Sequence, residues 1–180
     1  MAEHDDRIRL RHEDAALEGE RLGPGPADLR LLDVALRDCD LSNVDAAGGT
    51  IVRVEARGTR LTGFALEDGE VRGSRFSGCT LSLASLARST VREVRFEDCD
   101  LREASFMGAR LIGVSFDRCR LEGADFREAQ IVAPTAIRGS SLDGVLGLES
   151  LRGLRMPWED IVGSAGALAA ELGIEVEEPG

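Results

Sequence analysis

Apolar residues recur at every fifth position between Leu31 and Ala136, and the phase does not change over this stretch. This period matches neither the about 3.6 residues of an α-helical turn nor the two-residue alternation of a β-strand. A second column, two residues before each apolar position, holds mostly small side chains. Two residues after each apolar position, Gly, Asp or Asn is common, and these residue types tolerate the positive φ of tight corners. Each unit is therefore predicted to be a short extended piece followed by a corner.

Sorting the apolar positions by a repeat of 20 residues gives four columns, each with its own type of side chain. The columns are Leu31, Ile51, Val71, Val91, Leu111 and Ile131; Leu36, Ala56, Phe76, Phe96, Phe116 and Ala136; Leu41, Leu61, Leu81, Leu101 and Leu121; and Ala46, Leu66, Leu86, Phe106 and Phe126. A five-residue period alone does not require this segregation. It indicates coils of four units, stacked in register with about 4.8 Å between rungs.

Units such as Ala124–Asp125–Phe126–Arg127–Glu128 fit the consensus Ala-Asp/Asn-Leu-x-x. The chain therefore resembles the pentapeptide-repeat family over roughly residues 29–137. The resemblance implies a mainly β fold: a right-handed, four-sided parallel β-helix, here of about five coils and followed by a capping α-helix.

Three regions are expected along the chain. Residues 1–28 form an acidic N-terminal segment, residues 29–137 the β-helix, and residues 138–180 an irregular last coil, a capping helix over about 157–172 and an acidic tail. Pro157 is predicted to open the helix and Gly173 to end it. The chain has no apolar run long enough to cross a membrane and begins with an acidic, polar segment, so a cytoplasmic location is expected.

The predicted C-terminal helix has two open interpretations, which can hold together. It covers the unpaired strand edge at the end of the solenoid, or it contacts a second copy of the chain in a homodimer. Its candidate contact residues are Trp158, Ile161, Ala165, Leu168 and Leu172.

The four cysteines, Cys39, Cys79, Cys99 and Cys119, all fall in the column of small inner residues, on one predicted wall. The simplest interpretation is that each acts as a small buried hydrophobic residue. A disulfide between stacked neighbours is a second interpretation, although a cytosolic chain is usually reduced. Metal binding is a third, but no CxxC pair or nearby His accompanies the thiols.

Nothing in the sequence predicts an active site, a cofactor site or a metal site. The only histidines, His4 and His12, lie outside the repeat, and there is no nucleophile elbow, P-loop or dinucleotide fingerprint. We therefore expect a non-catalytic protein that acts as a scaffold for a protein partner. Direct nucleic-acid binding is not expected, because no basic surface with aromatic residues is apparent.

The family resemblance implies an alternative, because some members mimic duplex DNA, bind DNA gyrase or topoisomerase IV and give fluoroquinolone resistance. The net charge of −11 fits such a role, but the solenoid itself holds 17 acids against 15 arginines. A DNA mimic needs continuous negative potential to meet the basic groove of its target. The most acidic predicted face carries Asp45, Glu67, Asp68, Asp125 and Glu128, with Arg88 and Arg127 among them.

Overall fold

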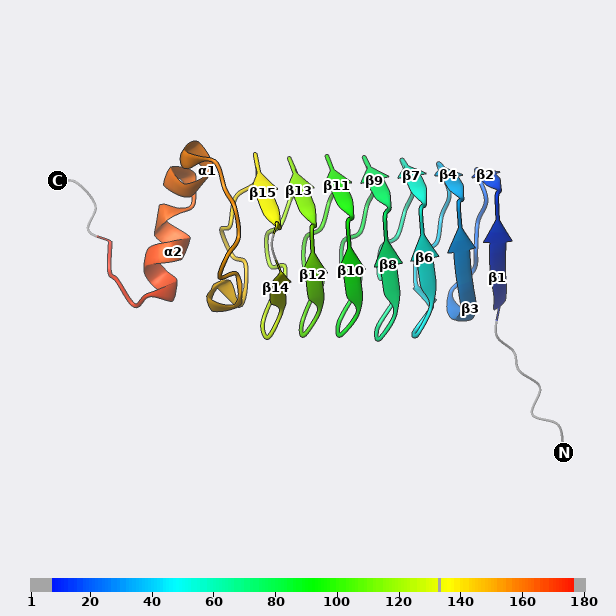
Figure 1. Cartoon of the computed structure of the whole chain (residues 1–180), viewed down its shortest axis with the longest axis horizontal. Coiled ribbons are helices and arrows are strands. Elements are labelled where there is room, and N and C mark those ends of the chain that lie inside the picture. The colour runs from blue at the N-terminus through cyan, green and yellow to red at the C-terminus, as the bar shows by residue number, and fades with distance from the viewer. Residues whose placement is uncertain (1–7, 133, 177–180) are drawn as a thin grey trace, which may run out of the picture.

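The computed structural model describes residues 8–132 and 134–176. In this part of the chain the strands stack side by side into a rod, with β1 at one end and two helices at the other (Figure 1). All strand pairs are parallel, and they form two sheets that run the length of the rod.

The first sheet has seven rungs along its main path. They are β1 (Ile8–Glu13), β3 (Gly25–Leu32), β6 (Thr50–Val52), β8 (Glu70–Arg72), β10 (Thr90–Arg92), β12 (Arg110–Ile112) and β14 (Gln130–Val132), and β5 (Val44–Asp45) pairs with the start of β3. The second sheet also has seven. They are β2 (Ala16–Glu18), β4 (Ala35–Arg37), β7 (Glu55–Arg57), β9 (Arg75–Ser77), β11 (Arg95–Glu97), β13 (Ser115–Asp117) and β15 (Ala136–Arg138).

The other two walls are ladders of mostly single β-bridges. One runs through Arg21, Asp40, Arg60, Thr80, Asp100 and Arg120, and the other through Asp45, Ala65, Ser85, Ser105, Asp125 and Leu146. Two sheets and two bridge ladders make four walls, so the expected four-sided parallel β-helix is confirmed. The described part of the chain has more coils than the five expected, because the ladder continues beyond both predicted ends.

The centre of the rod is filled by the side chains of the four sorted columns. Phe96 stacks on Phe76 and on Phe116, with 5.2 Å between ring centroids on each side. Phe106 stacks on Phe126 at 5.0 Å, and it meets Phe116 edge to face at 5.5 Å. Offset and edge-to-face aromatic pairs add to the stabilisation that burial gives, so these two columns form a continuous apolar seam.

Each corner of the regular coils is turned by a residue in the left-handed region. From Asp33 to Glu128, every position two residues after a central apolar position has a positive φ. Non-glycine residues such as Arg53 and Leu83 adopt it as well as Gly, Asp and Asn. The stacking of the coils thus imposes the corner even where the local sequence does not favour it.

The ladder begins at β1, whereas the sequence placed the start of the solenoid at residue 29. Ile8 pairs with Ala27, but Arg30 pairs with Thr50, so the first coil is one residue shorter than the next. This deletion shifts the apolar positions of the first coil out of the five-residue phase. Leu10 lies opposite Leu29 and is buried, although the repeat count does not reach it.

A one-residue insertion shifts the register near the other end. Leu111 pairs with Ile131, but Phe116 pairs with Ile137. The sorted column placed Ala136 beneath Phe116, and that assignment is wrong, because Ile137 takes this central position and is fully buried. The chain then forms a short 3₁₀ turn, η1 (Leu148–Ser150), and a last bridge from Ala136 to Arg155.

The single helix expected over residues 157–172 is two short helices, α1 (Trp158–Gly163) and α2 (Ala165–Glu171). The break is at Ser164, whose φ of −100° and ψ of 7° depart from helical values. Within the described residues, no helix has the length and apolar character needed to span a membrane. The predicted acidic tail at residues 177–180 lies outside the described residues.

Candidate functional site

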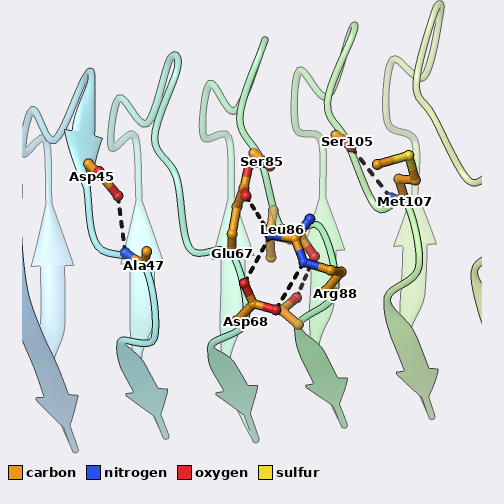
Figure 2. A network of polar contacts seen from close by, with 10 residues as sticks. Asp45, Ala47, Glu67, Asp68, Ser85, Leu86, Arg88, Ser105 and Met107 are labelled. Atoms are coloured by element: carbon orange, nitrogen blue, oxygen red, sulfur yellow. Dashed lines mark hydrogen bonds and ion pairs between the residues drawn. The ribbon is translucent and has the colours of Figure 1, made fainter.

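The predicted acidic face comes together on one wall and its corner, but its members are spread over several coils. Asp45 and Asp125 lie in the same bridge ladder, four rungs apart, which corresponds to about 19 Å. Asp68 and Glu128 occupy corners, both with positive φ. Figure 2 shows that the carboxylates of Asp45 and Glu67 lie on neighbouring coils of this wall.

A network of polar contacts joins one arginine to two carboxylates in the middle of the acidic face (Figure 2). The Arg88 guanidinium donates from Nε to one oxygen of Asp68 at 3.0 Å and from Nη2 to the other at 2.9 Å. The same Nη2 lies 2.8 Å from Glu67, which also accepts a hydrogen bond from Ser85 Oγ at 2.8 Å. The hydrogen bond from Arg88 lowers the pKa of Asp68 below its usual value, so this carboxylate is ionised at neutral pH.

Asp125 is paired in the same way, but with a residue of its own coil. Arg127 donates from Nη2 to Asp125 at 2.6 Å and from Nε at 2.9 Å. These bonds lower the pKa of Asp125. Three of the five carboxylates of the acidic face are thus matched by arginines. Asp45 and Glu128 take part in no ion pair among the described residues. The acidic face therefore keeps an excess of negative charge that is interrupted at Arg88 and Arg127.

Between its carboxylates this wall carries mostly short, uncharged side chains. Ser85 and Ser105 follow Asp45 along the ladder, and Ala47 and Met107 stand beside them. The amide of Ala47 donates to Asp45 at 3.2 Å, and the amide of Met107 donates to Ser105 Oγ at 3.4 Å. Such local bonds hold the side chains of Asp45 and Ser105 close to the backbone.

The candidate contact residues at the C-terminal end divide between the end of the solenoid and the outside. Leu168 is half-buried and, with Ile161, lines an apolar hollow of about 210 Å³ above the last coil. Trp158 and Leu172 point outward and are 75% and 76% exposed. Ala165 is exposed. The structure thus brings only part of the predicted set against the solenoid.

Two residues that the sequence did not single out attach the helices to the last coil. Asp160 accepts a hydrogen bond from the amide of Gly139 at 2.7 Å, and Ser164 Oγ accepts one from the amide of Leu142 at 3.2 Å. In the preceding coils, the equivalent amides donate to carbonyl groups of the next coil, as Arg118 does to Arg138. Among the described residues, no further coil follows the last one to supply carbonyl acceptors. The side chains of Asp160 and Ser164 take the place of these carbonyls, so the amides of Gly139 and Leu142 still have hydrogen-bond acceptors.

The four cysteines are buried and free, and they share one wall with Thr59. Each Sγ lies within 3.3 to 3.5 Å of backbone carbonyl oxygens. The neighbouring Cys99 and burial both raise the pKa of Cys119 above its usual range. The Cys119 thiol is therefore protonated at neutral pH, and all four thiols are shielded from solvent, as small buried hydrophobic residues would be.

Of the two histidines, His4 lies outside the described residues, and His12 is half-buried in β1 opposite Leu31. Among the described residues, no group of three or more His, Cys, Asp or Glu side chains is placed to hold a metal ion.

The comparisons with known proteins agree with this architecture. A family model described as a pentapeptide repeat region matches residues 57–126. The chain is similar in fold to HetL, a pentapeptide repeat protein involved in heterocyst differentiation regulation from the cyanobacterium Nostoc sp. strain PCC 7120. The identity is 18% and the TM-score 0.50, over 84% of this chain and 90% of that chain.

Two further solved structures are more distant. One is QnrB1, a plasmid-mediated fluoroquinolone resistance protein, at 16% identity and a TM-score of 0.35, over 95% of this chain and 98% of that chain. The other is Rfr23 from the cyanobacterium Cyanothece 51142, at 12% identity and a TM-score of 0.34, over 81% of this chain and 86% of that chain. A search of curated protein sequences finds no match. The uninterrupted five-residue repeat, the four-walled coil and the matching family model together show that residues 57–126 are a pentapeptide repeat region and that the chain has the fold of pentapeptide repeat proteins.

Proposed function

We propose that this protein is a non-catalytic scaffold that binds a protein partner along its outer walls. The observation that supports this most is the difference in role between the inward-facing and the outward-facing side chains. The side chains of the inner columns are buried in the core, whereas the outward side chains form straight columns over successive coils. A regular surface of this kind offers extended contact area along the rod.

The acidic face is the candidate docking wall for that partner. Asp45 and Glu128 supply carboxylates outside any described ion pair, and the paired Glu67 and Asp68 lie between them along the rod. Rim charges of this kind steer association and select the partner more than they add affinity. A partner with spaced basic side chains fits this pattern better than one with a single basic groove.

The test is quantitative affinity capture from the native cell with three forms of the full chain. The first is the wild type, the second is Asp45→Ala/Glu128→Ala, and the third is Glu55→Ala/Glu70→Ala, which removes the same charge from the two sheet walls. The proposal expects a saturable protein partner that the second form loses and the third retains. Equal retention by all three forms would place the contact elsewhere, and the absence of any saturable partner would contradict the scaffold function.

The alternative partner is DNA gyrase, or topoisomerase IV, bound by mimicry of duplex DNA. The net charge of −11 supports it. Arg88 and Arg127, which pair with three carboxylates of the acidic face, weigh against it, because they interrupt the negative potential. A supercoiling assay with purified gyrase tests this alternative. Inhibition by micromolar wild-type protein, or protection of gyrase from a quinolone, would favour mimicry. The absence of both effects would exclude it.

The exposed side chains of the C-terminal helices support a second contact, with another copy of the chain. Trp158, Val162 and Leu172 are each more than half exposed, and like ends of two rods would bury the same patch on both sides. Sedimentation velocity should show a dimer for the wild type and a monomer for Trp158→Ala/Leu172→Ala. A monomeric wild type at high micromolar concentration would contradict the dimer contact, and the helices would then only cover the end of the solenoid.

A further inference from the structure

Three arginines from distant parts of the sequence surround a hollow on the second sheet, near the C-terminal end of the rod. Arg95 belongs to β11, Arg138 to β15, and Arg155 to the last bridge. The hollow has a volume of about 450 Å³, and besides these arginines it is lined by Gly113, Val114, Ser115, Asp117, Pro134 and Ala136. We call it the arginine groove.

The register explains how these side chains come together. Arg95, Ser115, Ala136 and Arg155 are consecutive rungs of one outward column. The two arginines therefore stand about 14 Å apart at their backbones, with only small side chains between them. Ser115 and Ala136 have short side chains, so they leave the space between the long side chains of Arg95 and Arg155 open.

The charge of the arginine groove is opposite to that of the protein. Its lining holds three guanidinium groups and one carboxylate, Asp117. Arg138 Nη1 is 3.6 Å from Asp117 Oδ1, which is an ion pair but longer than a hydrogen bond. Arg95 and Arg155 take part in no ion pair among the described residues. The groove therefore has unmatched positive charge and free N–H donors in a chain with a net charge of −11.

The neighbouring hollow shows that this arrangement is not a general property of the wall. It is lined by Arg53, Arg75 and Arg95, but also by Glu55 and Glu93. Asp33 holds Arg53 in an ion pair with two hydrogen bonds, and Glu97 lies 3.5 Å from Arg75. There Arg53 and Arg75 join successive coils, whereas Arg95, which lines both hollows, and Arg155 take part in no ion pair among the described residues.

From this geometry we propose that the arginine groove is a binding site for a phosphoryl group. A guanidinium presents donors in a planar fork that matches two oxygens of a phosphate, and several such forks can share one dianion. Ser115 adds a hydroxyl at the floor. The phosphoryl group can be carried by a small molecule or by a phosphorylated side chain, and both share the chemistry that the groove recognises. This site is independent of the acidic face and of the scaffold proposal.

The test uses amide NMR titrations of the full chain at low salt with three probes: inorganic phosphate, pyrophosphate and a phosphoserine peptide, with the unphosphorylated peptide as reference. We expect saturable shifts of the Gly113, Ser115 and Ala136 amides. The variant Arg95→Ala/Arg155→Ala should weaken binding at least about tenfold. Arg37→Ala/Arg57→Ala, which removes two exposed arginines from earlier rungs of the same sheet, should leave the affinity unchanged.

The probes also identify the source. Tighter binding of pyrophosphate than of the phosphopeptide would indicate a small-molecule ligand, and the reverse order would indicate a phosphorylated protein. Thermal unfolding of each variant confirms that it is folded. The proposal is overturned if none of the three probes shifts these amides at millimolar concentration, or if the two double variants lose affinity equally.

Discussion

Arg88 stands one coil above Asp68, and its guanidinium contacts both oxygens of the Asp68 carboxylate, at 3.0 and 2.9 Å. The same relationship joins Asp98 to Arg118 at 2.8 and 2.9 Å, and it joins Asp33 to Arg53. Each pair links residues 20 apart at a corner, so it ties successive coils on the outside of the rod. These pairs are exposed, so each contributes little to stability by itself.

Acid titration should reveal these corner pairs. The hydrogen bond from Arg88 lowers the pKa of Asp68 in the folded chain below the 3.8 of an unpaired carboxyl. The pair therefore adds stability above about pH 3.8, and this contribution is lost as the pH falls. Asp68→Asn should be slightly less stable than the wild type to urea at pH 7 and low salt, and the difference should vanish at pH 2.

The matched control is Glu128→Gln, at the same corner of a later coil and in no described ion pair. It should be as stable as the wild type at both pH values. If Asp68→Asn were as stable as the wild type at pH 7 and low salt, the pair would have no role in holding the coils together.

The aromatic column should be the most sensitive part of the core. Phe96 is fully buried and has a phenyl ring stacked on each side at 5.2 Å. Phe96→Ala should lower the free energy of unfolding by about 3–5 kcal/mol, because it removes the buried area and both ring contacts and leaves a cavity that the neighbouring coils cannot close.

Phe96→Leu should cost clearly less, since Leu fills much of the same space, as the Leu residues of a neighbouring column do. Urea denaturation monitored by circular dichroism gives both values. An equal loss for the two variants would indicate that the stacking geometry, rather than filled volume, governs this position.

The sequence could predict the middle of the fold because each coil there has the same length. Phe76, Phe96 and Phe116 are found stacked as the 20-residue sorting required, and Cys79, Cys99 and Cys119 share a wall. The ends could not be predicted in the same way. A single missing residue in the first coil moved Leu10 out of phase, and a single extra residue put Ile137 where Ala136 was expected.

The candidate sites were harder to predict, because they depend on neighbours in space rather than on spacing. The acidic face could be assembled from the repeat, but the pairing of Glu67 with Arg88 needs side-chain conformations. The arginine groove needs the shifted register, which places Arg155 in the column of Arg95. The role of Asp160 and Ser164 depends on side-chain hydrogen bonds to the last coil, which the repeat pattern does not show.

The cap hydrogen bonds should matter for the stability of the last coil. Ser164→Ala leaves the buried amide of Leu142 without its acceptor at 3.2 Å, and Asp160→Ala does the same to Gly139. The loss at Leu142 should cost about 1–3 kcal/mol. The loss at Gly139 should cost less, because this residue is exposed and water can accept from its amide. Hydrogen exchange at these two amides should accelerate more than at the amides of the central coils.

Glu159→Ala is the control, because Glu159 lies between Trp158 and Asp160 in α1 but is exposed. Its exchange rates should match the wild type. Unchanged protection of Leu142 in Ser164→Ala would show that the helices cover the last coil without bonding to it.

The stacked thiols of Cys99 and Cys119 should produce a loss of stability at alkaline pH. Cys99 has its pKa raised to about 12 in the folded chain, against 9.0 in the unfolded chain. The protonated thiol therefore favours the folded state fully below pH 9, and this contribution is lost as the pH rises from 9 towards 12. The sequence has no Lys and no Tyr, so the cysteines are the side chains that titrate in this window.

Urea midpoints at pH 8, 9.5 and 11 should fall for the wild type and fall less for Cys99→Ala/Cys119→Ala. A thiol reagent at pH 8 should label none of the four cysteines in the folded wild type and all four in urea. Rapid labelling of the folded chain would mean that this wall opens.

The most direct test is an experimental structure of the chain, in which the positions of three cysteines are measured. The account predicts that the Cα atoms of Cys79, Cys99 and Cys119 lie on successive rungs about 4.8 Å apart, with all three thiols facing the core. Cysteines on different walls, or separated by an intervening strand, would contradict the 20-residue coil and every surface derived from it.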